Sequence, residues 1–365
     1  MTQTAKRNRV IFLDLIRAFA VLNMVQGHTI DVLLSKDYRS LDYLLYGIWN
    51  FNRGMTAPLF MFTAGTTFTY LFRIQSSGFT DNPRFAKGFK RAMLLLFTGY
   101  LIKLPTGNPL YILDVPEKKW ELFFAADVLQ IISFGLLFLL LYLYLAERFK
   151  IKDIYLLGTG VLITTFLAPV VLNISWTDYL PLSAANYLYM DHGSLFTIFP
   201  WLAYILAGGI LGSYLAKAGR IQQERNLGVT VSVSGMVMLL AALLSELAEV
   251  YITGNSTFWM HSPALVFLRL GLVLIVTALF IFISIGVRNI PKVIVLLGRN
   301  TLIIYVVHLV ILYGSPWSAG INRFVGYTFT PLETVTAALV MFGLMIAMVI
   351  IFNKLNFKNR QLVTS

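Results

Sequence analysis

The sequence alternates long apolar runs with short polar segments, the pattern of a chain that crosses a membrane many times. A helix of about 20 apolar residues spans the hydrocarbon core of a bilayer. Ten such runs occur, and they predict an all-α, polytopic integral membrane protein. The predicted spans cover residues 10–34, 54–72, 92–112, 122–146, 154–173, 195–216, 227–252, 263–287, 300–314 and 333–353.

Composition supports a membrane protein and excludes several other classes. Of the 365 residues, 58% are apolar and 13% are charged, and the mean hydropathy is +0.74. Soluble domains carry about 45–50% apolar and about 25% charged residues, so soluble, disordered and nucleic-acid-binding proteins do not fit. The chain has no cysteine, which excludes thiol nucleophiles and disulfides. With no long linker or visible internal repeat, we expect one domain over residues 1–365.

The distribution of basic residues predicts the orientation of the spans. Lysine and arginine outnumber aspartate and glutamate by 29 to 17, a net charge of +12. With the N-terminus inside, 20 of the 29 basic residues fall in cytoplasmic segments, 7 in outer segments and 2 within spans. Cytoplasmic loops of membrane proteins are enriched in Lys and Arg. We therefore expect both termini on the cytoplasmic side. The first span follows a basic segment and lacks a small-residue cleavage site, so we interpret it as retained.

Ionisable residues within the first span indicate a functional interior. Asp14, Arg17, His28 and Asp31 fall within an arc of about 100° on a helix with 100° per residue. Arg17 and His28 lie roughly 16 Å apart along that helix. Because charged groups in hydrocarbon are costly, this face predicts a water-accessible or ligand-lined cavity. Two structural alternatives remain: Asp14 and Arg17 could pair at the inner interface, and His28 could be a hydrogen-bonded core residue.

Later spans contribute further polar side chains at the outer depth. Asp127 lies in the fourth predicted span, and Glu246 and Arg269 lie at matching depths in neighbouring spans, where a buried ion pair is plausible. Tyr305 and His308 lie in the middle of the ninth span. These residues make a histidine-centred site with nearby carboxylates, which suits general-base chemistry.

Other types of site do not fit the sequence. The four histidines lie on different elements with no HExxH spacing, and we expect His192 and His261 to be solvated in outer loops. No phosphate-binding glycine motif and no serine nucleophile elbow is present. We therefore predict no metal and no permanently bound cofactor.

Four motifs, in order along the chain, resemble those of transmembrane acyltransferases. They are Asp14-x-x-Arg17 followed by His28; Ala57-Pro58-Leu59-Phe60-Met61-Phe62-Thr63-Ala64-Gly65; Phe199-Pro200-Trp201 leading to Gly208, Gly209 and Gly212; and Leu297-Gly298-Arg299-Asn300-Thr301 through Tyr305 to His308. The third motif is similar to that of the heparan-α-glucosaminide N-acetyltransferase branch. The ten-residue gap between Arg17 and His28 looks closer to the acyltransferase-3 group.

The sequence departs from the family pattern at two places. Ala18 follows Arg17 where these families usually have glycine. In the heparan branch the position of His28 is typically asparagine, and the acting histidine lies in the next outer loop. Residues 29–55 of this chain contain no histidine, so that acetyl-histidine scheme cannot be transferred.

The resemblance implies transfer of an acyl group, acetyl above all, from cytoplasmic acyl-CoA to a hydroxyl or amine of an extracytoplasmic glycan or lipid-linked acceptor. Acyl-CoA would be a co-substrate, and the location would be a bacterial cytoplasmic membrane, with a homo-oligomer left open. A secondary transporter or flippase, and a scaffold with structural ion pairs, are the alternatives. The expected roles are catalysis by His28, Asp31 and Asp127; donor binding by Asp14, Arg17, Arg299 and Asn300; and substrate lining by Arg53, Glu246, Arg269, Tyr305 and His308.

Overall fold

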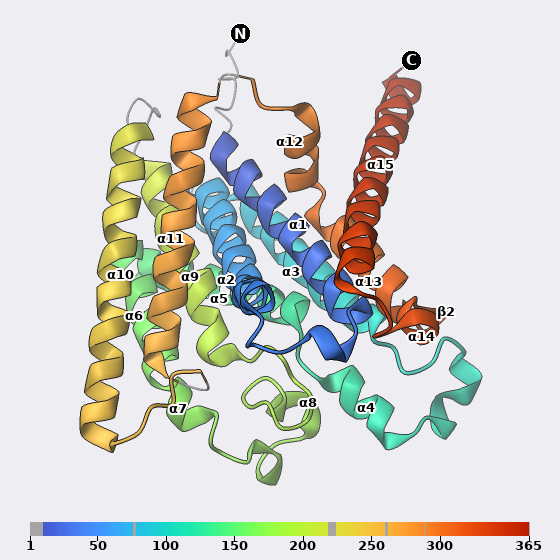
Figure 1. Ribbon diagram of the computed structural model, residues 1–365. Helices are drawn as coiled ribbons and strands as arrows, with labels where there is room; N and C mark the ends of the chain where they lie inside the picture. Colours follow the sequence, from blue (N-terminus) through green and yellow to red (C-terminus); the bar gives the residue numbers. More distant parts are fainter. Residues whose placement is uncertain (1–9, 76–77, 218–223, 260–261, 288, 365) are drawn as a thin grey trace.

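The computed structural model describes residues 10–75, 78–217, 224–259, 262–287 and 289–364, most of which lie in helices (Figure 1). The first half contains α1 (Ile11–Leu33), η1 (Lys36–Tyr38), α2 (Leu44–Arg73), α3 (Pro83–Ile102), η2 (Pro109–Asp114), α4 (Glu117–Phe124), α5 (Val128–Arg148), α6 (Asp153–Phe166), α7 (Ala168–Val171), η3 (Trp176–Asp178) and α8 (Leu182–Ala185). The second half contains α9 (Ile198–Lys217), α10 (Glu224–Thr253), α11 (Pro263–Gly286), α12 (Lys292–Arg299), α13 (Thr301–Tyr313), β1 (Gly314–Ser315), β2 (Ser318–Ala319), α14 (Asn322–Val325) and α15 (Pro331–Thr364).

Within the described residues, five helices are long and apolar enough to cross a membrane: α5, α9, α10, α11 and α15. Helices α12 and α13 make a sixth if they form one span, bent by 77° at Asn300. Helices α1, α2 and α3 have 23, 30 and 20 residues, but their polar side chains lower their hydropathy. The all-α membrane fold is thereby confirmed, whereas the count of ten spans and their orientation stay predictions. Helix α1 begins and α15 ends at the same end of the bundle (Figure 1).

Several predicted boundaries are wrong because capping residues set the helix ends. The span predicted at 92–112 is α3, which begins at Pro83 after Asn82, whose side chain accepts a hydrogen bond from the Arg84 amide at 2.9 Å. The span predicted at 122–146 begins at Val128, because Asp127 caps α5. The span predicted at 154–173 is broken into α6 and α7, where Pro169 stands in the first turn of α7.

Glycines bring α2 and α9 into direct backbone contact. A Cβ atom at Gly65 of α2 would lie 2.0 Å from the carbonyl oxygen of Ile205 in α9. Conversely, a Cβ atom at Gly208 of α9 would lie 2.0 Å from the carbonyl oxygen of Phe62 in α2. Small residues at such crossings allow helices in membranes to pack closely. The second and third sequence motifs therefore meet each other and build the scaffold.

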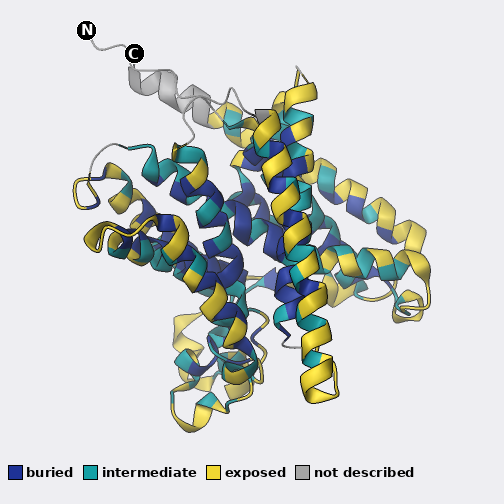
Figure 2. Ribbon diagram, turned by 90° about the vertical axis from the view of Figure 1, so that its left-hand side faces the viewer, coloured by how far each residue is buried: buried dark blue, intermediate teal, exposed yellow. Residues whose placement is uncertain are grey.

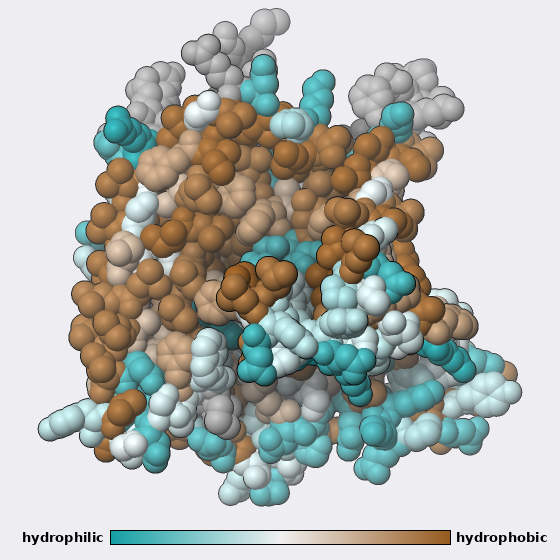
Figure 3. All heavy atoms as spheres, in the orientation of Figure 1, coloured by the Kyte–Doolittle hydropathy of each residue, from teal (hydrophilic) through white to brown (hydrophobic). Residues whose placement is uncertain are grey.

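Helix α1 runs through the middle of the bundle and packs against α2, α11, α12, α13 and α15. Buried residues concentrate there, whereas the peripheral helices expose much of their surface (Figure 2). The space-filling view shows a continuous apolar surface over α10 and α11, and a hollow with hydrophilic side chains between that surface and α15 (Figure 3). The polar face predicted on α1 thus lies within the bundle.

Candidate functional site

Two histidines from opposite ends of the sequence meet in the structure. The rings of His28 on α1 and His308 on α13 have centroids 5.4 Å apart. Tyr305 packs edge-on to His308 with a centroid separation of 5.9 Å, and Tyr313 packs edge-on to His28 at 5.6 Å. His308 and Tyr305 are buried, and His28 is half-buried. The structure therefore brings together three of the residues that the sequence selected.

The hydrogen bonds of the two rings define their roles. His28 Nδ1 lies 3.0 Å from the hydroxyl of Tyr313. His308 Nδ1 lies 2.7 Å from the carbonyl oxygen of Ile304, which can only accept, so this nitrogen carries the proton. In the neutral ring, Nε2 of His308 then presents a lone pair, and it is buried with no hydrogen-bond partner among the described residues. An unpaired buried polar atom costs about 1–3 kcal/mol, which marks it as a candidate contact for a substrate.

The backbone around the α12–α13 bend positions these side chains. A Cβ atom at Gly298 would lie 2.1 Å from the carbonyl oxygen of Asp14, so α12 crosses α1 at backbone contact. Asn300 occupies the bend, where its side-chain amide donates to the carbonyl of Leu296 at 2.8 Å. Helix α13 ends after Tyr313 at Gly314, whose φ of +91° favours glycine.

Asp31 is held by arginines and does not bond to His28. Its carboxylate accepts from Arg53 at 2.5 Å and lies 3.7 Å from Arg39. Arg53, which is exposed, also lies over the ring of Trp49, 5.3 Å from its centroid. Among the described residues no carboxylate hydrogen-bonds to His28, so the expected orientation of the imidazole by an aspartate is wrong. That contact comes from Tyr313.

Asp127 approaches the same site from α5. One carboxylate oxygen accepts from the amide of Val128 at 2.7 Å, and the other lies 3.3 Å from Lys103 Nζ. Asp127 is close enough for its charge to act on His28, Tyr305 and Tyr313. It therefore contributes negative potential to the site rather than a direct hydrogen bond.

Arg17 lies about three turns from His28 along α1, towards the opposite end of the bundle. Its guanidinium donates to the hydroxyl of Thr301 at 3.3 Å, at the start of α13. Asp14 and Arg91 of α3 are close enough to act on it electrostatically. Arg299, one residue before the bend, is exposed. Arg17 of α1 and Arg91 of α3 thus form a cationic region, with Asp14 beside it.

The predicted partners Glu246 and Arg269 do not form an ion pair within the described residues. Arg269 of α11 instead lies over the ring of Trp201, 5.4 Å from its centroid, and near Gly54 of α2. One carboxylate oxygen of Glu246 is buried with no partner among the described side chains and backbone. The expected pair is therefore wrong, and Glu246 lies on α10, which packs against α11.

The remaining histidines and possible metal ligands lie elsewhere. His192 is half-buried, with Nδ1 4.0 Å from a carboxylate oxygen of Glu121, and His261 falls outside the described residues. Among the residues that the structure describes, no three His, Asp or Glu side chains are placed to hold a metal ion together.

Sequence reasoning missed a second charged cluster as well as Tyr313. Arg73, the last residue of α2, makes two hydrogen bonds to Asp153, at 2.9 and 2.7 Å. Asp153 is buried and also accepts from Ser213 at 2.6 Å, and Lys217 lies 3.9 Å away. Asp153 is the first residue of α6, where a carboxylate is typical of any helix start, so the sequence carried no signal of this pairing.

The fold and the site define a class: a helical integral membrane protein in which side chains from α1, α5 and α13 converge on a histidine pair. The profile of the family heparan-alpha-glucosaminide N-acetyltransferase, catalytic, matches residues 9–240. The match covers more than half of the chain, so the protein belongs to this family, which implies acetyltransferase activity. No curated protein matches the chain significantly. The matched region contains His28, whereas His308 lies beyond it.

Proposed function

We propose that the protein transfers an acetyl group from cytoplasmic acetyl-CoA to a hydroxyl or amine of an extracytoplasmic glycan or lipid-linked acceptor. The observation that carries this proposal is the pairing of His28 with His308, 5.4 Å apart, in a chain of an acetyltransferase family. A bacterial cytoplasmic membrane would provide the two sides that this reaction needs.

In the proposed reaction, His28 acts as the general base. If Nδ1–H of His28 donates to the oxygen of Tyr313, Nε2 presents its lone pair to the acceptor. The acceptor loses its proton to Nε2 as its oxygen or nitrogen bonds to the thioester carbon. The carbon–sulfur bond then breaks, and the CoA thiolate takes the proton back from the imidazolium. His308 Nε2 would orient the acceptor by accepting a hydrogen bond from a second O–H or N–H group of the acceptor, one that does not react.

The cationic region around Arg17 suits the donor. CoA is polyanionic, and the positive charges of Arg17 and Arg91, which act on each other through space, would attract its phosphates. Arg17 and His28 are separated by roughly 16 Å along α1, about the length of an extended pantetheine arm. We propose that the phosphates bind near Arg17 and the thioester reaches His28.

A thermal-stability measurement tests the donor site without knowledge of the acceptor. Acetyl-CoA at 100 times its dissociation constant should stabilise the detergent-purified protein by about 2.7 kcal/mol. Arg17→Ala should lose this stabilisation, whereas Arg148→Ala, at an exposed position on the last turn of α5, should retain it. Absence of stabilisation in folded wild-type protein would refute the acetyl-CoA site and favour the transporter alternative.

The role of His28 needs a second assay. Radiolabelled acetyl transfer in membranes should be lost in His28→Ala while stabilisation by acetyl-CoA persists. Full transfer by that variant would exclude His28 as the base.

A further inference from the structure

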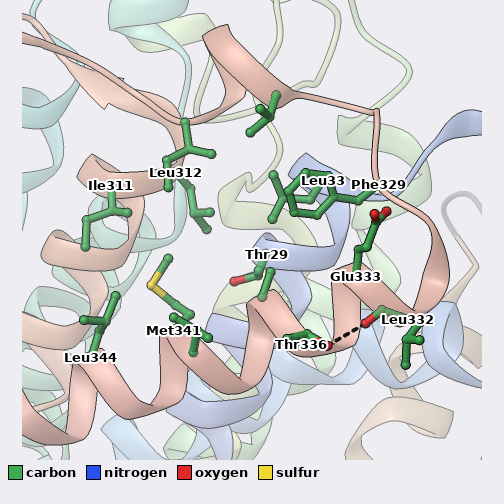
Figure 4. A pocket seen from close by; sticks show the side chains of 14 residues that line it. Thr29, Leu33, Ile311, Leu312, Phe329, Leu332, Glu333, Thr336, Met341 and Leu344 are labelled. Atoms are coloured by element: carbon green, nitrogen blue, oxygen red, sulfur yellow. Dashed lines mark hydrogen bonds between the residues drawn. The ribbon is translucent and has the colours of Figure 1, made fainter.

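A long apolar groove lies between α1, α13, α14 and the first half of α15 (Figure 4). Its volume is about 650 Å³. Its floor is built from buried side chains, and its outer wall from exposed side chains of α15. Its lining includes Thr29, Leu312, Leu332, Thr336, Met341 and Leu344.

The walls of this groove offer almost no free polar group. The hydroxyl of Thr29 donates to the carbonyl of Val25 at 2.7 Å, and that of Thr336 donates to the carbonyl of Leu332 at 2.9 Å. Both threonines therefore present their methyl groups. The carboxylate of Glu333, at one end of the groove, accepts two hydrogen bonds from Thr330, both at 2.8 Å. Such a surface suits a hydrocarbon chain rather than a sugar.

The length of the groove matches one leaflet of a bilayer. From Leu332 to Leu344 the groove follows α15 for 12 residues, roughly 18 Å at 1.5 Å per residue. Half of a hydrocarbon core about 30 Å thick is about 15 Å. Helix α15 belongs to the candidate membrane spans, and Leu332, Val340 and Leu344 are exposed, so the groove opens towards lipid. One lipid chain could enter it sideways from the leaflet.

Cationic side chains stand at the end of the groove where a headgroup would lie. The segment after α14 pairs with the end of α1, because the amides of Tyr327 and Phe329 donate to the carbonyls of Val32 and Leu33, both at 2.9 Å. Lys36 and Arg39 lie over the ring of Tyr327, at 5.6 and 4.8 Å from its centroid. Lys36 is exposed. Arg39 is paired with Asp31, so the exposed ammonium of Lys36 supplies the charge that complements the phosphate of a lipid headgroup.

The same end of the groove adjoins the histidine site. Tyr327 is close enough to act electrostatically on Tyr313, whose hydroxyl lies 3.0 Å from His28. Thr29, which follows His28 directly in α1, lines the groove. We propose that this groove binds the hydrocarbon chain of a phosphate-bearing, lipid-linked acceptor, whose headgroup then extends over Tyr327 to His28. This inference rests on the proposed acyl transfer and specifies its acceptor as a lipid.

Two tryptophan substitutions on α15 provide a matched test. Ala337 lines the groove, so Ala337→Trp should fill it, whereas Leu339→Trp lies outside the groove at a position that is 62% exposed. Membranes containing each protein receive acetyl-CoA labelled in the acetyl group and are extracted with chloroform and methanol. Label should enter the organic phase with wild type and Leu339→Trp, and should fall at least tenfold with Ala337→Trp. Stabilisation by acetyl-CoA should be equal in all three proteins, which shows that the variants fold.

The outcomes separate the two proposals. Label found only in water-soluble glycan, or undiminished in Ala337→Trp, would overturn the lipid acceptor and leave acetyl transfer standing. No label in any fraction, together with no stabilisation by acetyl-CoA, would refute the proposed function and with it the acceptor.

A second readout tests the groove independently of transfer. Phosphatidylglycerol with a diazirine in its acyl chain, incorporated in nanodiscs, should cross-link to peptides around Met341 in wild type and Leu339→Trp but not in Ala337→Trp. Equal labelling of α10 and α15, or labelling that Ala337→Trp does not reduce, would show that the groove binds no chain.

Discussion

Gly298→Ala should separate α12 from α1. We expect a small decrease in the unfolding temperature and a large decrease in the rate of acetyl transfer. The added Cβ would lie 2.1 Å from the carbonyl oxygen of Asp14 and 3.0 Å from its carbonyl carbon, and backbone atoms cannot rotate away. Ordinary contact begins at 3.4 Å, so the two helices must move apart by about 1.3 Å. Because α12 leads through Asn300 into α13, this displacement reaches His308.

The magnitude follows from that displacement. Overpacking of this kind costs about 1–3 kcal/mol of stability. In a protein of this size each kcal/mol lowers the unfolding temperature by about 2 °C. A shift of 1 Å in a catalytic group can reduce the rate by about a hundredfold. We therefore expect an unfolding temperature lower by a few degrees and a transfer rate lower by about two orders of magnitude.

The assay combines thermal unfolding in detergent with the initial rate of labelled acetyl transfer. Gly343→Ala is the matched control, because a Cβ at that position of α15 meets nothing within 4 Å. Alanine in place of a helical glycine should then stabilise by up to about 1 kcal/mol, with the transfer rate unchanged. A Gly298→Ala protein that transfers acetyl at the wild-type rate would refute the link between the α1–α12 contact and the site.

Two other substitutions follow from single contacts. Tyr313→Phe removes the hydroxyl 3.0 Å from His28 Nδ1. Losing this hydrogen bond costs about 1–3 kcal/mol, which should lower kcat/KM by roughly one to two orders of magnitude. Unchanged kinetics would show that the action of His28 does not depend on the Tyr313 hydroxyl. Asp153→Ala leaves Arg73 without its bidentate partner and should cost about 3–5 kcal/mol of stability. Lys217→Ala, which removes an exposed ammonium 3.9 Å from the same carboxylate, should cost less than about 1 kcal/mol. Equal decreases in unfolding temperature for these two variants would contradict the assigned partnership.

The sequence predicted which polar residues belong to the site, but it did not predict the contacts that they make. The 100° periodicity placed Arg17, His28 and Asp31 on one face of α1 because that relation is local to one helix. The contact between His28 and His308 depends on how α1 and α13 cross. Periodicity within a single helix does not predict such a crossing. Tyr313 lay unnoticed because a tyrosine near the end of an apolar helix is common in membrane proteins.

Helix ends were predicted least well, for an identifiable reason. Hydropathy detects where apolar residues begin, whereas capping decides where a helix begins. At α3 and α5 the caps Asn82 and Asp127 lie at different positions from the change in hydropathy. The predicted Glu246–Arg269 ion pair was wrong for a different reason. Equal depth in neighbouring helices does not determine the direction in which a side chain points.

The glycine contacts between α2 and α9 limit how this protein can move. Because the backbones touch at Gly65 and Gly208, sliding or rotation of one helix against the other would drive carbonyl groups into the opposite main chain. The two helices must therefore move as one rigid body. Any conformational change that admits a substrate to His28 has to arise on the other side of α1, at α13 and α15.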